Sequence, residues 1–269
     1  MEVSKRYQII GSTINNAMAI NESCVNGFDK YRIKSQTYCS PYRRRSTISD
    51  GMFLMTMYHL QYDMPSDLIL SDYINECVDI GVEYFCGELP EDEEDRLEVI
   101  KAPDNEDLVW IDPFSQGLFC ALLLNREQEI EKLCSWVEAD LYLDGGLSDM
   151  EEHSHYLYMS IAAELRSAPM PGIEDKEAAI EQCRKKRSKL LYSVWQAVRN
   201  KDQVAFNKAF EESLKHYEKY DLGKEYATDW IAQNQSLLWL LAERNGLSFP
   251  ELPEKLAAMV VTRETLGLE

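Results

Sequence analysis

The sequence is poor in the residues that punctuate β-structure. Its 269 residues include only 12 Gly and 9 Pro, and most of its apolar residues recur at helical spacing instead of alternating with polar ones. Sandwiches and barrels need frequent turn residues between short strands, and parallel α/β folds need runs of strand-forming residues. This scarcity argues against all-β and α/β folds, and the apolar spacing predicts an all-α protein.

Long apolar segments are missing as well. No uninterrupted apolar run of about 18 residues occurs, and the first twenty or so residues contain no apolar stretch long enough for an export signal. The seven cysteines are odd in number and scattered. Cys77, Cys120 and Cys134 fall on apolar helical faces, where a free thiol behaves as a small hydrophobic group. We therefore expect a cytoplasmic protein in a reducing compartment, with no membrane contact.

Motifs for catalysis and metal binding are absent. The chain has four histidines and no HExxH, Cys-x-x-Cys, Walker, GxGxxG or GxSxG pattern. Glu152 and His155 have the Glu-x-x-His spacing of a di-iron bundle, but such a site needs this motif twice and two further carboxylates. His59 lies in an apolar run typical of a core, and His216 lies near a helix end. We therefore expect no enzyme activity, no metal and no cofactor.

The clearest helical pattern lies between residues 188 and 246, where three apolar stripes at helical spacing are separated by polar breaks. Asp202 precedes the second stripe as an N-cap, and Gly246 follows the third at a position that favours glycine. Short connections make such helices antiparallel neighbours, with a core around Trp195, Phe210 and Trp239. The stripes contain Leu190, Leu191, Val194, Trp195 and Val198; Phe206, Ala209, Phe210, Leu214 and Tyr217; and Trp230, Ile231, Leu237, Leu238 and Leu241.

Two helices are expected early in the chain. An apolar run over 51–60 predicts a buried helix in which several methionines serve as adaptable core residues. Pro65-Ser66-Asp67 marks the start of the next helix. Its buried side is predicted from the apolar residues Leu68, Ile69, Tyr73, Cys77, Ile80 and Tyr84.

The middle of the chain predicts further helices. Residues 103–113 are typical of a loop, and residues 114–137 predict a helical hairpin that turns at Asn-Arg-Glu-Gln, 125–128. This turn is similar to Asn-Lys-Asp-Gln at 200–203, which suggests a repeated hairpin plan. Helices are expected over 149–167 and 174–187, on either side of the break Pro169-Met170-Pro171-Gly172.

Together these segments predict about ten helices arranged as antiparallel hairpins, in a bundle or a short helical-repeat-like array. A chain of this length can bury the core of one large domain, and we expect a single all-helical domain over 1–269. The break at 169–172 also permits a division into an acidic part, 1–168, and a C-terminal helical core, 173–269.

The charge of the chain is concentrated in its middle. The formal net charge is −19, while residues 61–175 alone contain 29 acidic against 5 basic residues, a net of −24. Such a segment repels nucleic acid and anionic membrane and attracts a basic partner. A solvated acidic surface with no partner would have the same composition.

Two parts of this acidic segment are candidate contact surfaces. Glu91 to Asp95 are five consecutive acids, which suit either the start of a helix after Pro90 or a patch that faces Lys and Arg. Trp110, in the expected loop, would be either an interface anchor or an aromatic packed onto the core. The predicted partner-binding residues are Glu91, Asp92, Glu93, Glu94, Asp95, Asp104, Glu106, Asp107 and Trp110.

The C-terminal third resembles a known family. The string from Ser193 to His216 combines a helix, a short charged turn and a second helix that ends near His, and Leu237–Leu247 continues it with a Leu- and Ala-rich helix. With the tail Leu252–Leu256 and the hairpin over 121–136, this pattern is similar to the helical immunity protein 49 family of bacterial toxin systems. The resemblance extends mainly over 113–138 and 188–256, and its matching residues are packing residues.

This resemblance implies an antitoxin that binds and neutralises a cognate secreted toxin by occluding its active site. The acidic middle segment suits a basic, nuclease-type toxin, because acids in the cleft would compete with the phosphate backbone. The alternative is a helical-repeat scaffold that binds an endogenous protein or peptide, and a third possibility is an enzyme with an unrecognised site. A gene for a basic, toxin-like protein beside this one would favour the antitoxin. A concave groove in the absence of such a gene would favour the scaffold, and a cofactor that co-purifies with the protein would favour the enzyme.

Overall fold

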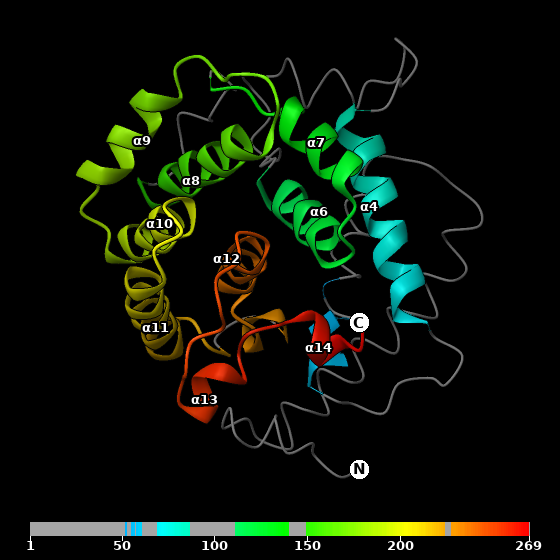
Figure 1. Cartoon of the computed structure of the whole chain (residues 1–269), viewed down its shortest axis with the longest axis vertical. Coiled ribbons are helices and arrows are strands. Elements are labelled where there is room, and N and C mark those ends of the chain that lie inside the picture. Colours follow the sequence, from blue (N-terminus) through cyan, green and yellow to red (C-terminus); the bar gives the residue numbers. More distant parts are fainter. Residues whose placement is uncertain are drawn as a thin grey trace. The chain divides into compact units, whose positions relative to one another are not determined.

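The computed structural model describes residues 52, 55–56, 58–60, 69–86, 111–139, 149–223 and 227–268. Within these ranges the chain forms ten α-helices, one 3-10 helix and no strand (Figure 1), which confirms the all-α prediction. None of the helices described there is long and apolar enough to cross a membrane. The helices are α4 (Leu70–Cys86), α6 (Ile111–Leu123), α7 (Glu127–Trp136), α8 (Asp149–Leu165), α9 (Ile173–Gln182), α10 (Lys186–Arg199), α11 (Gln203–Tyr220), η1 (Ala227–Trp230), α12 (Gln233–Arg244), α13 (Glu254–Ala257) and α14 (Arg263–Leu266).

The chain divides into two compact units. Unit 1 comprises 1–38, 49–74 and 193–269, and unit 2 comprises 39–48 and 75–192. The break at Pro169–Gly172 therefore lies within unit 2, where it joins α8 to α9. Gly172 has a φ of 84° at the start of α9, a backbone conformation that glycine adopts without strain.

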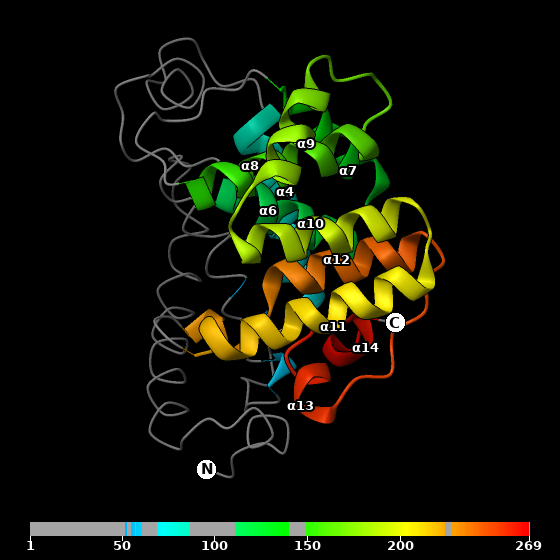
Figure 2. The same cartoon turned by 90° about the vertical axis from the view of Figure 1, so that its left-hand side faces the viewer.

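The core of unit 1 is aromatic, as the apolar stripes predict. Helix α11 packs against α12 and α13 (Figure 2). Phe206 and Phe210 stack with ring centroids 5.0 Å apart, and Phe206 lies 6.3 Å from Trp239. Trp195, Phe210 and Trp239 are all buried, so the predicted burial of these three side chains is confirmed.

Both predicted end signals of this region are confirmed. The Asp202 carboxylate accepts hydrogen bonds from the N–H groups of Val204 (3.1 Å) and Ala205 (3.0 Å), as an N-cap does. Gly246 has a φ of 82°. Its N–H donates to the Glu243 carbonyl and the next N–H donates to the Ala242 carbonyl, the paired bonds of a Schellman motif.

Replacing Asp202 with alanine should lower the free energy of unfolding by about 1 kcal/mol, because the first N–H groups of α11 would lose their acceptor. Asp202→Asn is the matched control, since its amide oxygen can accept the same bonds, and it should lose much less. Urea unfolding of the three proteins measures both differences. Equal losses for the two variants would show that the cap geometry does not matter.

The two helical hairpins with similar turn sequences also share a backbone geometry. In α6–α7, Asn125 has a φ of 53°, and in α10–α11 Lys201 has a φ of 54°. In each hairpin the N–H of this residue and the N–H of the next residue donate the pair of hydrogen bonds of a Schellman motif. The equivalent residues are therefore Asn125 and Lys201, one position away from the pairing that the residue types suggest.

Four boundary predictions are wrong in detail. Helix α4 begins at Leu70, so Ile69 precedes it and is 59% exposed. Helix α6 begins at Ile111, which places Pro113 in its first turn, where a missing N–H costs little. Trp230 lies in η1, because α12 starts only at Gln233. The helix expected over 174–187 ends at Gln182 as α9, and the following helix, expected from residue 188, begins at Lys186 as α10.

The buried face of α4 also differs from the prediction. Tyr73 and Ile80 are only half-buried, and Cys77 is buried as expected. Leu68 and the Tyr84 side chain lie outside what the structure describes. The buried apolar side chains are those of Leu70, Ile74, Cys77, Val78 and Phe85.

Candidate functional site

The partner-binding residues predicted from the sequence lie outside the described residues. This holds for Glu91, Asp92, Glu93, Glu94, Asp95, Asp104, Glu106, Asp107 and Trp110, so their role stays a prediction. The described part of the acidic segment offers a different candidate, on α4 and α7 of unit 2.

Helices α4 and α7 border a cavity of about 290 Å³ that opens to solvent. Three of its lining side chains are acidic, one is basic, and the remaining two are a valine and a cysteine. We call this cavity the acidic groove. Its lining residues are Asp79, Val82, Glu83 and Cys86 from α4, and Glu129 and Lys132 from α7.

Aromatic packing holds α4 in place beside the groove. Phe85 of α4 lies with its ring centroid 4.5 Å from that of Trp136 in α7 and 6.1 Å from that of Phe114 in α6. A Cβ built on Gly117 of α6 would lie 3.8 Å from the Cα of Gly81, so the two helices approach closely where neither has a side chain. The helix that forms one wall of the groove is therefore held by close packing.

Arg126, at the start of α7, joins the two walls of the groove. Its Nη1 lies 2.7 Å from an oxygen of Asp79 and 3.3 Å from Asn75 Oδ1, and its Nη2 lies 2.9 Å from an oxygen of Glu129. The hydrogen bond from Arg126 lowers the pKa of Glu129, and the same bond raises the pKa of Arg126. The Glu129 carboxylate is therefore held in the charged form at neutral pH.

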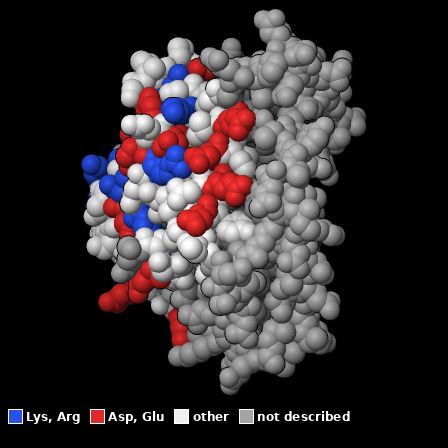
Figure 3. All heavy atoms as spheres, turned by 90° about the vertical axis from the view of Figure 1, so that its right-hand side faces the viewer, with Lys and Arg blue, Asp and Glu red and all other residues white. Residues whose placement is uncertain are grey.

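Three acids of α4 lie on one helix face, and two of them line the groove. Glu76, Asp79 and Glu83 follow one another at i, i+3 and i+7, the spacing of one helix face. Asp79 and Glu83 are exposed, and Glu76 is half-buried. Figure 3, from the side on which α4 lies in Figure 1, shows acidic side chains gathered with basic ones between them. In the sequence these acids could be recognised by their helical spacing, whereas the contact surface was predicted from a run of consecutive acids elsewhere.

Cys86 at the end of the groove has no sign of nucleophilic activation. Its thiol donates a weak hydrogen bond to the Lys132 carbonyl (3.5 Å). Partial burial of the sulfur raises the pKa of the Cys86 thiol, an effect that the positive charge of Lys132 only partly offsets. A thiol with a raised pKa is largely protonated at neutral pH and therefore reacts slowly.

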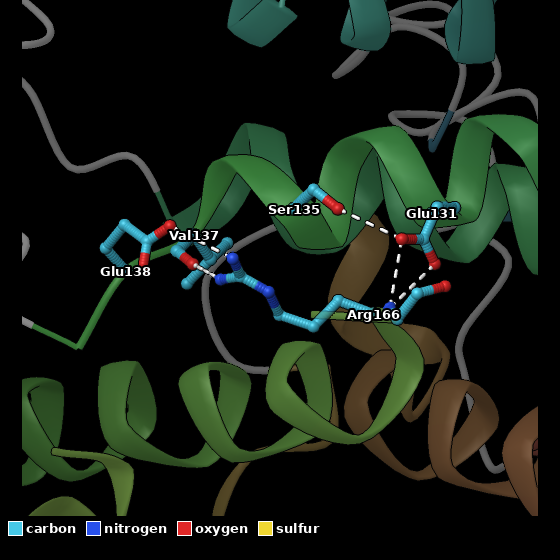
Figure 4. A network of polar contacts seen from close by, with 6 residues as sticks. Glu131, Ser135, Val137, Glu138 and Arg166 are labelled. Atoms are coloured by element: carbon cyan, nitrogen blue, oxygen red, sulfur yellow. Dashed lines mark hydrogen bonds and ion pairs between the residues drawn. The ribbon is translucent and has the colours of Figure 1, made fainter. Parts of the chain in front are cut away.

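A polar network fixes the far end of α7 to α8 (Figure 4). The side chain of Arg166, only 7% exposed, donates to the Val137 carbonyl (2.6 Å) and to Glu138 (3.1 Å). Glu131 accepts from the backbone N–H of Ser167 at 3.0 and 3.1 Å and from the Ser135 hydroxyl at 3.2 Å. The network anchors the helix that carries one wall of the groove.

We expect this network to make folding sensitive to acid. The hydrogen bonds that Glu131 accepts, first of all from the Ser167 N–H, lower the pKa of its carboxyl group from the ordinary value of 4.5. A carboxyl group with a lower pKa in the folded state stabilises the fold above that ordinary value and loses this contribution as pH falls through the folded value. We therefore expect Glu131→Gln to lose stability at neutral pH and to depend less on pH below about 4.5.

Urea unfolding at several pH values tests this expectation, with Glu212→Gln, an exposed residue of α11, as a control for the loss of one carboxylate. The same acid dependence in wild type and Glu131→Gln would contradict a role for this carboxylate.

The histidines hold no described metal site. His59 is buried, with Nε2 2.6 Å from the Ala258 carbonyl oxygen and Nδ1 3.0 Å from Thr265 Oγ1, so it is a core residue as expected. His155 is also buried, and the side chain of Glu152 is outside the described part. Among the described residues, no group of three or more His, Cys, Asp or Glu could hold a metal ion.

The described site therefore consists of an open groove with fixed carboxylates on two packed helices. Acids arranged in this way can bind ammonium or guanidinium groups through charge-assisted hydrogen bonds. In comparisons with known protein families, curated proteins and solved structures, the chain matches none.

Proposed function

We propose that this chain is an immunity protein that binds a basic, secreted toxin and neutralises it by covering its active site. The observation that carries the proposal is the acidic groove, where Asp79 and Glu83 on α4 face the same cavity as Glu129 on α7. The net charge of −24 over residues 61–175, to which the groove acids contribute, and the resemblance to the immunity protein 49 family also support it.

The fixed charges of the groove suit a basic partner. Glu129 and Asp79 are already positioned by Arg126, so they need little ordering when a partner binds. Asp79 is 64% exposed and is open to Lys or Arg side chains. A nuclease toxin has such side chains where it binds phosphates, so a groove that engages them would exclude the nucleic acid.

Co-expression tests this function. The reading frame next to this gene, as the toxin candidate, would be expressed in a sensitive bacterium, with and without this chain. We expect growth to stop with the toxin alone and to recover when the chain is present. Growth arrest in both cases would contradict an antitoxin role.

The alternative is a helical scaffold that binds an endogenous protein or peptide. The shared turn geometry of α6–α7 and α10–α11 favours it, because repeated helical hairpins form extended binding surfaces. A scaffold would give no protection against the neighbouring gene product and would bind its own partner in cells that lack the toxin gene. The co-expression experiment therefore separates the two functions.

The run Glu91–Asp95 is a separate prediction from the sequence. If it contacts the toxin, changing all five acids to their amides should slow toxin association and make the rate less dependent on salt, since rim charges mainly set association rates. Stopped-flow mixing at several ionic strengths measures both. An unchanged rate and salt dependence would show that the run is only a solvated surface.

A further inference from the structure

A compact group of basic residues lies where α9 passes into α10, in unit 2. Arg184, Lys185 and Lys186 are consecutive and exposed, and we call them the basic turn. Lys189, one helical turn further on, is exposed as well. These residues belong to a chain whose net charge is −19, so they form a local region of opposite sign.

The backbone of the basic turn is anchored. Cys183 is buried, and its N–H donates to the Ile180 carbonyl (3.1 Å) at the end of α9. Its sulfur accepts a hydrogen bond from the Lys185 N–H (3.2 Å), and the Lys185 carbonyl accepts from the Lys189 N–H (3.1 Å) in α10. The three cations therefore project from a backbone with defined geometry.

The three positive charges of the basic turn do not stabilise the fold. Arg184, Lys185 and Lys186 make no ion pair with the described residues. The first turn of α10 contains no acidic residue, and cations at a helix start oppose the helix dipole. An external anionic group would relieve this repulsion.

We propose that the basic turn is a second interaction surface, which binds a carboxylate-rich segment of a protein partner. Guanidinium and ammonium groups form charge-assisted hydrogen bonds with carboxylates, and an anchored backbone limits the entropy that binding costs. This surface is separate from the acidic groove in sequence and in charge, and it does not depend on the antitoxin function.

The arrangement favours a short acidic protein segment over nucleic acid. Nucleic-acid sites follow a phosphate backbone over several nucleotides, with aromatic side chains for the bases. Here the basic cluster spans only 184–189: Ser193, further along α10, is neutral and exposed, and Tyr192 is buried. The net charge of −19 also repels a long polyanion more strongly than a short one.

Fluorescence anisotropy on the full chain tests the proposal. The probes are a labelled oligoglutamate peptide and a labelled single-stranded oligonucleotide. The variant Lys185→Glu with Lys186→Glu is compared with Lys208→Glu with Lys215→Glu, two exposed lysines of α11. Both double variants change the net charge equally, so a difference between them reports the position of the charges. Circular dichroism and thermal unfolding confirm that each variant is folded.

We expect wild type to bind oligoglutamate, more weakly as salt rises, and the basic-turn variant to bind about tenfold more weakly. The α11 variant should bind like wild type. No oligoglutamate binding by wild type, equal losses in the two variants, or tighter binding of the oligonucleotide than of oligoglutamate would each overturn the proposal.

Discussion

Replacing Trp195 with alanine is expected to lower the free energy of unfolding by roughly 3–5 kcal/mol, the usual cost of truncating a buried aromatic residue. Trp195 is 1% exposed and is the largest of the fully buried side chains in the described part of the chain. Its removal would take apolar surface out of contact and leave a cavity that the surrounding helices only partly fill.

Urea unfolding measures this loss, and Val204→Ala is the matched control. Val204 is an apolar residue of α11 that is 81% exposed, so its truncation should change stability by no more than about 0.5 kcal/mol. A loss below about 1 kcal/mol for Trp195→Ala would mean that the indole is not part of a packed core.

Reversing the charge of the acidic groove is expected to slow toxin association by about tenfold to a hundredfold, the range over which complementary charges change association rates. The variant combines Asp79→Lys with Glu83→Lys, which places two cations where the proposed toxin would bring its own. Asp79 is exposed, and exposed ion pairs contribute little to folding, so the variant should remain folded.

The control for this variant reverses two exposed acids of unit 1, Glu212 and Glu251, to lysine. Both double variants change the net charge by the same amount, so long-range attraction falls equally in the two. Stopped-flow association at low and moderate salt should show the large effect only for the groove variant. If both variants slowed association equally, the attraction would come from net charge, and the groove would not be the contact surface.

The helices with complete apolar stripes could be predicted from the sequence. In α10 and α11 the apolar residues recur every three or four positions, and Trp195, Phe206 and Phe210 are buried as this spacing indicates. Asp202 and Gly246 mark helix ends through local properties: Asp202 supplies a side-chain acceptor for free N–H groups, and Gly246 adopts a positive φ. Signals that act within one turn can be read without knowledge of tertiary contacts.

Features that depend on packing could not be predicted. The chain between α9 and α10 turns without Gly or Pro, because Cys183 is buried and its sulfur takes the Lys185 N–H. On α4 the aromatic Tyr73 is only half-buried while Val78 is fully buried, since the neighbouring helices decide which face is covered. Apolar residue type alone does not distinguish these positions.

The same reason explains why the candidate groove was missed. Runs of consecutive acids stand out in a sequence, whereas the groove combines Asp79 and Glu83 with Glu129, more than forty residues later. Arg126 connects them only because α4 and α7 pack together. Acids at helical spacing on α4 were the one signal available in advance.

The most direct measurement of the proposed function is the activity of the purified toxin candidate, the product of the adjacent gene, in the presence of increasing amounts of this chain. If the candidate is a nuclease, cleavage of a labelled nucleic acid reports its activity. The proposed function predicts that cleavage falls to background near one chain per toxin, and that the groove variant, Asp79→Lys with Glu83→Lys, requires a large excess. Full cleavage in the presence of excess wild-type chain would contradict it.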